Sequence, residues 1–141
     1  MTSAKTRGAR TRGSWNPRHP PSKAKRRAER WGRLSEALCA LWLRLKGYRI
    51  LGRNLRTPEG EIDILARRGR ILAVIEVKSR DEALVAGEAV TAAKQKRLLR
   101  AARYLMGRMP DPAGLSIRFD AMLVSKRGLS HVIDAWRDEA P

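Results

Sequence analysis

The chain has 141 residues, the length of one domain, and its 31 Lys and Arg residues against 14 Asp and Glu residues leave a net charge of +17. No run approaches the ~20 apolar residues that a membrane-spanning helix needs, and no apolar segment follows the basic N-terminus as in a secretory signal. Cys39 is the only cysteine, which excludes an intrachain disulfide framework and a cysteine-rich zinc site. We therefore expect a cytoplasmic protein that does not enter a membrane.

Residues 1–28 are predicted to form a disordered basic arm, and residues 29–141 a single domain. The arm mixes Arg, Lys, Gly, Ser and Pro and has too few apolar residues to offset the entropy of ordering. Two interpretations stay open. The arm could bind phosphate groups electrostatically, or it could serve only to keep the chain in solution.

A helix is predicted from Trp31 to Leu45. Its apolar residues recur at steps of three and four, and Gly47 follows at the position of a C-terminal cap. The apolar positions are Trp31, Leu34, Leu38, Leu41, Trp42 and Leu45. This stripe is expected to be the buried face of the helix.

The rest of the chain alternates between strand and helix patterns. Strands are expected at 48–56, 61–67, 70–78, 117–124 and 130–136, and a second helix at 92–106, with Thr91 as its N-cap. Thr57–Gly60 is predicted to form the first hairpin turn and Arg68–Gly69 the second. These elements predict an α/β fold with a central mixed β-sheet flanked by helices.

The residues that carry chemistry lie on the second and third predicted strands. Side chains alternate along a strand, so Glu76 and Lys78 share one face of the third strand. If Arg68–Gly69 is a two-residue loop, Asp63 lies opposite Val74 and diagonal to Glu76. Asp63, Glu76 and Lys78 are therefore expected on one patch.

Two neighbouring carboxylates beside apolar strand residues repel each other and are costly to bury. A divalent cation removes that cost, and oxygen ligands without His or Cys favour Mg²⁺ or Mn²⁺. Lys78 could then hold or deprotonate an attacking water, or offset charge on a phosphate in the transition state. The alternative is that Glu76 and Lys78 form a solvated strand face with a weak surface ion pair.

The order of these residues resembles the PD-(D/E)xK nuclease superfamily, which has the restriction-endonuclease fold. A closer similarity is to the YraN family of bacterial proteins, and it covers residues 31–136. The motifs that carry it are Gly32-Arg33, Glu36-Ala37, Gly47-Tyr48, Asn54-Leu55-Arg56, Gly60-Glu61-Ile62-Asp63, Glu76-Val77-Lys78-Ser79-Arg80, Lys94-Gln95-Lys96-Arg97, Arg118-Phe119-Asp120 and His131 to Trp136.

The resemblance implies a nuclease-type core in which Asp63 and Glu76 bind metal, Lys78 assists the water and Glu36 is an accessory carboxylate. Archaeal Holliday-junction resolvases are similar in this series, which suggests branched or structured DNA as a substrate. The chain departs from the superfamily pattern at Ile62, which stands where the pattern has proline.

Two helical residues have two interpretations each. Glu36 lies opposite the leucine stripe, where it would be solvent-exposed, but its neighbours Ala40 and Leu43 form a second apolar strip that could place it at a cleft edge. Gln95 borders the apolar face of the second helix. It could reach the cleft, or it could bond to backbone in the first turn.

Cations near the acidic motif are the expected contacts to phosphate groups. They are Arg56, Arg80, Lys94, Lys96 and Arg97. The expected function is a Mg²⁺- or Mn²⁺-dependent endonuclease acting on nucleic acid, DNA rather than RNA. The alternatives are a nucleic-acid-binding module that keeps the fold without turnover, and a protein-interaction subunit. A homodimer is left open.

Overall fold

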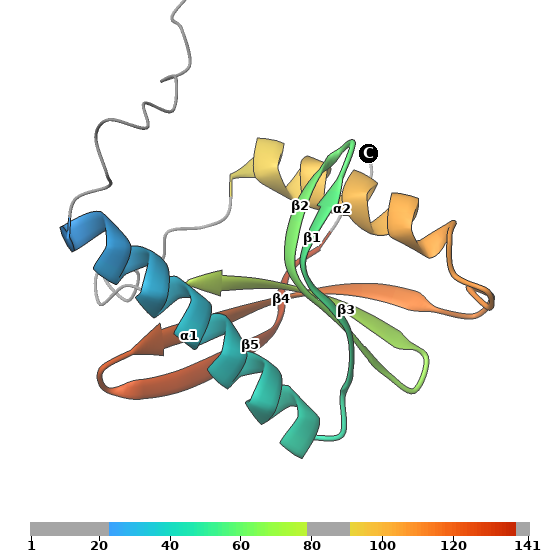
Figure 1. Ribbon diagram of the computed structural model, residues 1–141. Helices are drawn as coiled ribbons and strands as arrows, with labels where there is room; N and C mark the ends of the chain where they lie inside the picture. Colours follow the sequence, from blue (N-terminus) through green and yellow to red (C-terminus); the bar gives the residue numbers. More distant parts are fainter. Residues whose placement is uncertain (1–22, 79–90, 138–141) are drawn as a thin grey trace, which may run out of the picture.

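The computed structural model describes residues 23–78 and 91–137 (Figure 1). Two helices and five strands follow one another along the chain. They are α1 (Lys23–Leu45), β1 (Arg49–Thr57), β2 (Gly60–Arg68), β3 (Ile71–Lys78), α2 (Ala92–Met106), β4 (Ser116–Ser125) and β5 (Gly128–Trp136). All the predicted elements are present.

The five strands form one sheet in the order β1-β2-β3-β4-β5. Strands β3 and β4 pair in parallel, and the other neighbours pair antiparallel. The parallel pair requires a crossover connection, and α2 lies within it. The predicted α/β fold with a central mixed sheet is confirmed, and it is compatible with a nuclease-like core.

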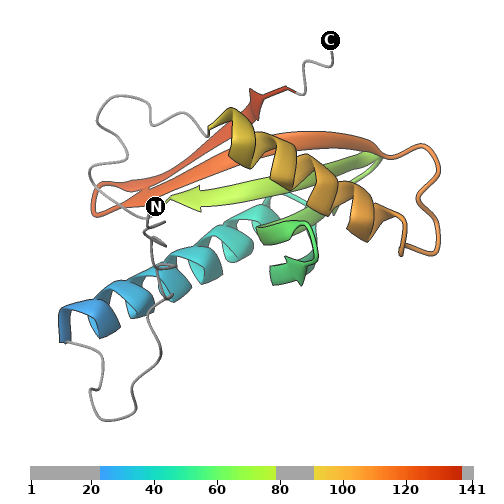
Figure 2. The ribbon, with the colours of Figure 1, turned by 90° about the horizontal axis from the view of Figure 1, so that it is seen from above.

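The helices cover opposite faces of the sheet (Figure 2). The core on the α1 face contains Cys39, Leu43, Ile64, Ile75 and Met122. The core on the α2 face contains Leu72, Val74, Leu98, Ala101 and Phe119. Strand β3 contributes to both cores, which explains the uninterrupted apolar run at its start.

Helix α1 begins at Lys23, inside the segment 1–28 that we assigned to the basic arm. The predicted start at Trp31 is therefore eight residues late. The added residues are mainly Lys, Arg, Ala and Glu, which have high helix propensity and extend a helix anchored further along the chain. Residues 1–22 of the arm lie outside the described residues.

The buried face of α1 is not the leucine stripe, so that expectation is wrong. Ser35, Cys39, Ala40 and Leu43 face the sheet and have no exposed surface. Three of these four are small, which lets the helix backbone approach the sheet closely. The stripe leucines are instead exposed, as at Leu41 with 53%.

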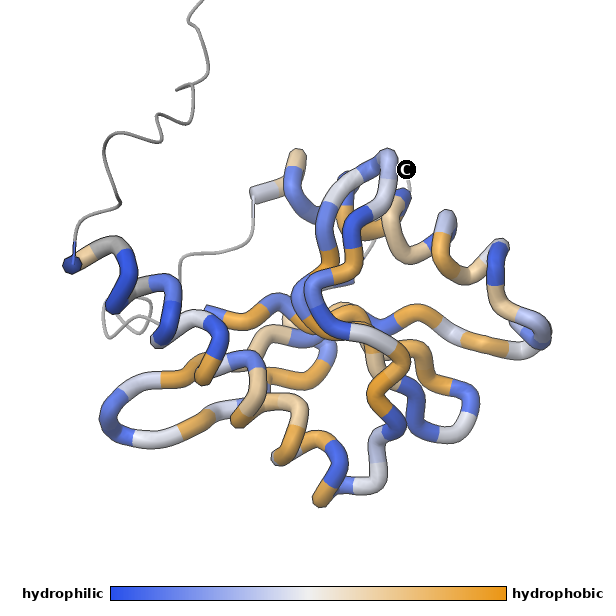
Figure 3. Tube along the Cα trace, viewed as in Figure 1, coloured by the Kyte–Doolittle hydropathy of each residue, from blue (hydrophilic) through white to orange (hydrophobic). Residues whose placement is uncertain are grey.

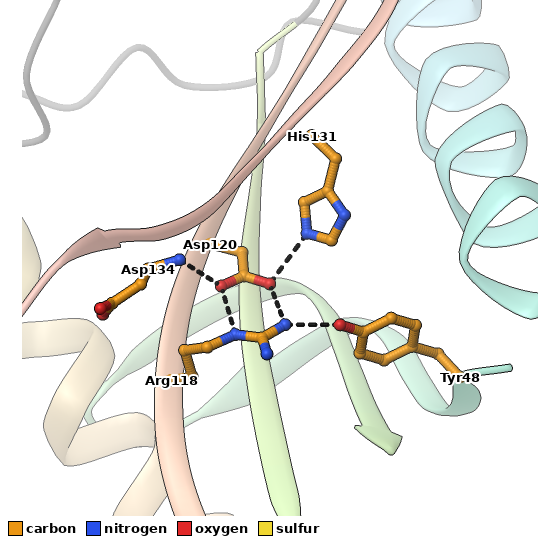
Figure 4. Close-up of polar contacts among 5 residues, drawn as sticks. All are labelled: Tyr48, Arg118, Asp120, His131 and Asp134. Carbon is orange, nitrogen blue, oxygen red and sulfur yellow. Dashed lines mark hydrogen bonds and ion pairs between the residues drawn. The ribbon is translucent and has the colours of Figure 1, made fainter. Parts of the chain in front are cut away.

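A buried polar network joins β4, β5 and the start of β1 (Figure 4). Asp120 is fully buried and accepts hydrogen bonds from two nitrogens of Arg118 at 2.8 and 2.7 Å, from His131 Nε2 at 2.8 Å and from the Asp134 backbone N–H at 3.0 Å. Arg118 also donates to the Tyr48 hydroxyl at 2.6 Å. Every oxygen of the Asp120 carboxylate is therefore paired by groups of the fold.

Within residues 23–78 and 91–137, neither helix combines the length and apolar character that crossing a membrane requires.

Candidate metal and nucleic-acid site

The β2–β3 register differs from the predicted one by two residues. The turn consists of Gly69–Arg70 rather than Arg68–Gly69, and Gly69 has a φ of 59°, in the left-handed region that glycine adopts readily. Leu65 lies opposite Val74, so the predicted pairing of Asp63 with Val74 is wrong. A shift of two residues keeps every side chain on its face, so the expected shared face is unaffected.

Asp63 and Glu76 meet where β2 and β3 separate. The last paired positions are Ile64 and Ile75, and the two carboxylates are the next residues along each strand. One oxygen of Asp63 accepts a hydrogen bond from the Val77 backbone N–H at 2.9 Å. The Asp63 side chain thus continues the contact between the strands after the backbone ladder ends.

The environment of Asp63 favours its neutral form. Burial first, and then the neighbouring Glu76 carboxylate, raise the pKa of Asp63 to about 7 from the ordinary 3.8. The hydrogen bond from Val77 opposes this increase in pKa, and Glu36 adds a smaller increase. The fold therefore stabilises the charged form of Asp63 beside Glu76 only in part.

Glu76 is 6% exposed and forms an ion pair with Lys94 of α2. The Thr91 hydroxyl accepts a hydrogen bond from the Lys94 backbone N–H at 3.3 Å, which caps the helix one residue before it begins. The first turn of α2 therefore faces the carboxylates, and its N-terminal dipole favours negative charge there. Lys94 was predicted as a phosphate contact, and its place beside Glu76 was not foreseen.

The two carboxylates open into a cavity of about 480 Å³ between the β1–β2 hairpin and α2. Its lining includes Asp63, Glu76, Lys94 and Arg97. Lys78 is the last residue of β3 and is half-buried beside β4, on the same strand face as Glu76. Lys78 is not among the described residues that line this cavity, and the lysine in contact with Glu76 is Lys94.

Glu36 lies on the inner side of α1 and points to the β1–β2 hairpin. Its carboxylate accepts a hydrogen bond from the Asn54 side chain at 2.7 Å. It lines a second hollow, of about 460 Å³, together with Arg33, Arg56 and Glu61. Glu61 lines both hollows, so the hollow beside Glu36 adjoins the cavity that contains Asp63 and Glu76.

The remaining predicted residues lie at different distances from the carboxylates. Arg97 lines the first hollow and Arg56 the second, whereas Lys96 is exposed on α2. Gln95 is half-buried, its backbone N–H bonds to the Thr91 carbonyl at 2.9 Å, and it is not among the described residues lining either hollow. Arg80 lies outside the described residues.

The carboxylate pair has the donor chemistry of a Mg²⁺ or Mn²⁺ site. Asp63 and Glu76 supply oxygen atoms, and such ions bind through one or two carboxylates while keeping several waters. Burial and then the Glu76 carboxylate raise the pKa of Asp63, and a bound cation would favour the charged form that both of them disfavour. In the part of the chain that the structure describes, no group of three or more His, Cys, Asp or Glu residues is placed to hold an ion. The site thus fits as a two-carboxylate site, with the remaining ligands left to water and substrate.

Sequence reasoning missed the pairing of Glu76 with Lys94 and the bond between Asn54 and Glu36. The Lys94 contact depends on how α2 crosses the sheet, which no local pattern encodes. Asn54 has a positive φ of 49°, and an isolated Asn inside a strand pattern was the available signal for an irregular backbone.

The fold and the site together define a class: a small α/β domain with a mixed sheet and a carboxylate pair where two strands part, compatible with a nuclease-like core. The chain belongs to the uncharacterised protein family UPF0102, the YraN family, whose model matches residues 35–124. The resemblance to the YraN family that the motifs indicated is therefore confirmed.

Relatives from several bacteria match most of the chain. A UPF0102 protein of Parvibaculum lavamentivorans is 53% identical over 111 residues, covering 78% of this chain and 84% of the relative. A UPF0102 protein of Paramagnetospirillum magneticum is 45% identical over 123 residues, covering 84% and 95%. A UPF0102 protein of Caulobacter vibrioides is 46% identical over 110 residues, covering 77% and 88%.

Proposed function

We propose that this protein is a Mg²⁺- or Mn²⁺-dependent phosphodiesterase that cleaves nucleic acid, DNA rather than RNA, in the cytoplasm. The observation that carries the proposal is the pair Asp63 and Glu76, brought together with a raised Asp63 pKa and open to a cavity that basic residues line. A carboxylate pair of this kind is unfavourable for folding alone, and its placement in a cleft favours a functional role.

In this proposal Asp63 and Glu76 would hold the ion. The ion would supply Lewis-acid activation of water and neutralise charge at the scissile phosphate. The Asp63 carboxylate is already held by the Val77 N–H, so its orientation is set before a ligand arrives.

Two lysines divide the remaining roles. Lys94 is paired with Glu76 in the free protein, and once a cation replaces it beside that carboxylate its ammonium group could contact a phosphate oxygen. Lys78 follows Glu76 on the same face and remains the candidate to orient or deprotonate the attacking water. Glu36 and Gln95 are accessory candidates, at the cleft edge and on α2 respectively.

Nucleic acid would lie along the two hollows. Arg97 and Arg56 each line one of them, and Arg33 lies near Glu36 on α1. These guanidinium groups can bind phosphates in a bidentate manner. Lys96, exposed on α2, would extend the basic surface beyond the cleft. Arg80, which lies outside the described residues, stays a candidate phosphate contact from the sequence alone.

The test is cleavage of labelled branched, single-stranded and duplex DNA and of RNA by the full chain in Mg²⁺, in Mn²⁺ and in EDTA. We expect metal-dependent cleavage of at least one DNA substrate and a loss of about 10³-fold or more in Asp63→Asn and Glu76→Gln. The matched control is Asp111→Asn, an exposed carboxylate on another part of the surface. Cleavage that survives Asp63→Asn would remove this site from the mechanism.

A second candidate function is nucleic-acid binding without turnover. It is favoured by the net charge of +17 and by the basic residues that line the two hollows. Binding would then fall steeply with salt and be indifferent to EDTA and to Lys78→Ala. Metal-dependent turnover would exclude it.

A further inference from the structure

Seven exposed residues form a line along the outer side of α1. They are Lys23, Arg27, Arg30, Leu34, Leu38, Leu41 and Leu45, and we call them the α1 row. They recur at steps of three and four residues, which places them on one helix face. The row is basic in its N-terminal half and leucine in its C-terminal half, and Figure 3 shows the same change from hydrophilic to hydrophobic along α1.

Three leucines of the row, Leu38, Leu41 and Leu45, line a hollow of about 300 Å³ between α1 and the β4–β5 hairpin. Leu38, Leu41 and Trp42 line it from the helix, and Val124 and Leu129 line it from the hairpin. Leu34, Leu38, Leu41 and Leu45 are 51%, 41%, 53% and 78% exposed. Four exposed leucines along one helix face, three of which line an apolar hollow, form a larger apolar surface than isolated surface leucines do, and such surfaces mark interaction sites.

We infer that the α1 row is the docking site for an acidic amphipathic helix of a partner protein. Steps of three and four are the spacing by which two helices interdigitate, so the leucine half fits apolar residues of another helix. The basic half continues the same line, so the partner's helix carries Asp and Glu there. Charge complementarity along one row fixes both the kind of partner and its direction.

The charges disfavour a second copy of this chain at this site. In a parallel pair, Lys23, Arg27 and Arg30 would lie beside their own counterparts. In an antiparallel pair, the basic half of one helix would approach Lys46 and Arg49, which follow α1 in the other copy. Like charges oppose both arrangements.

A bilayer surface fits the hollow less well. Docking into a concave hollow between a helix and a hairpin requires protruding side chains, which a partner helix has and a lipid surface lacks. An interfacial helix also buries a broad apolar face, whereas here the side of α1 with Cys39, Ala40 and Leu43 is already covered by the sheet.

The docking site is separate from the carboxylate cavity. Glu36 and the buried residues of α1 face the sheet and the β1–β2 hairpin, while the α1 row is exposed and three of its leucines line the hollow beside the β4–β5 hairpin. A helix bound along the row would leave Asp63 and Glu76 accessible, so the inference does not rest on the proposed nuclease activity.

The test uses the full chain and labelled helical peptides of about 20 residues, roughly the length of the row. The first peptide has leucines at steps of three and four in one half and glutamates at those steps in the other. The second has lysines in place of the glutamates, and the third has alanines in place of the leucines. Fluorescence anisotropy measures each affinity.

We expect the glutamate peptide to bind at least about tenfold more tightly than either other peptide. Leu41→Gln should weaken it about tenfold, while Ile133→Gln, a matched control at a residue that is 51% exposed on β5, should change it less than about twofold. The double substitution Arg27→Glu with Arg30→Glu should reverse the order and favour the lysine peptide.

Equal affinity for the three peptides, no binding, or equal losses in Leu41→Gln and Ile133→Gln would overturn the inference. Two further measurements identify other occupants. A dimer of the chain in sedimentation that Leu41→Gln dissociates would assign the row to a second copy. Leu41-dependent retention on phosphatidylglycerol vesicles, with no peptide binding, would assign it to a bilayer.

Discussion

The sheet carries two aspartates in opposite circumstances, Asp120 fully buried and Asp63 half-buried. Asp120 receives hydrogen bonds from Arg118, His131 and a backbone N–H, and although burial raises its pKa, these bonds together lower it to about 2. Asp63 receives one backbone N–H and faces Glu76, and its pKa is raised to about 7. The same residue type thus stabilises the fold where hydrogen-bond donors pair with its charge. Where they do not, it is suited to bind a cation.

The largest expected effect is the loss of stability when Asp120 is replaced. Asp120→Asn leaves the Arg118 guanidinium without its carboxylate partner in a largely buried place, and we expect the free energy of unfolding to fall by about 3–5 kcal/mol. The identical change Asp63→Asn removes a repulsion and should cost less than about 1 kcal/mol. Urea denaturation measures both. Equal losses in the free energy of unfolding for the two variants would contradict the view that the fold stabilises only the Asp120 carboxylate.

The second expected effect is selective stabilisation by metal. Mg²⁺ or Mn²⁺ at about 100 times its dissociation constant should add about 2.7 kcal/mol to the free energy of unfolding. Thermal unfolding with and without EDTA should show this increase in the wild-type chain and in Asp111→Asn, and should show none in Asp63→Asn. An increase that persists in Asp63→Asn would place the ion elsewhere.

The two aspartates should also give stability opposite dependences on pH. The pKa of Asp63 in the folded chain is above the ordinary 3.8. The stability that Asp63 contributes is therefore fully present below pH 3.8 and is lost as pH rises through about 7. The contribution of Asp120, with its pKa of about 2, is present above 3.8 and lost as pH falls towards 2.

In EDTA, the wild-type chain should therefore lose about 1–2 kcal/mol relative to Asp63→Asn between pH 4 and pH 8, a value reduced for partial exposure of the group. Urea denaturation at a series of pH values checks the difference. A difference between the two proteins that does not change with pH would show that Asp63 titrates normally.

The smallest expected effect is a difference in coupling free energy between the ion pair at the site and an ion pair on the surface. A double-mutant cycle of Lys94→Met and Glu76→Gln should give a coupling of about 1 kcal/mol, because the Glu76 side chain is only 8% exposed. The comparison pair Arg100 and Glu59, with side chains 53% and 45% exposed, should give about 0.3 kcal/mol or less. Saturating Mg²⁺ should reduce the first coupling and leave the second unchanged.

Local patterns predicted the elements of the fold well and the exposed surface of α1 poorly. Period-two patterns and turn residues placed each strand to within about two residues, because backbone pairing and turn geometry depend on neighbours in sequence. The prediction that the leucine stripe is the buried face of α1 was wrong, because periodicity identifies an apolar face without identifying which surface covers it. The sheet instead took the side with Ser35, Cys39 and Ala40.

The carboxylate site was predictable in part, because the face on which a strand residue lies depends only on its position along the strand. Parity along two strands joined by an even loop places Asp63 and Glu76 on one face, even though the register was off by two residues. The contacts of Glu76 with Lys94 and of Glu36 with Asn54 join residues 18 positions apart from different elements. Such contacts follow from the packing of helices on the sheet, and no local spacing contains them.

By itself, the sequence determined that this protein is basic, that its helices and strands alternate as in an α/β domain, and that two acids share a strand face, since charge, periodicity and parity are local properties of the chain. Only the tertiary structure decided which side of α1 is covered and which lysine contacts Glu76. It also decided which aspartate has its negative charge paired with hydrogen-bond donors of the fold. Those outcomes depend on surfaces that meet only after the chain has folded, where burial and the distance between charges set the free energy.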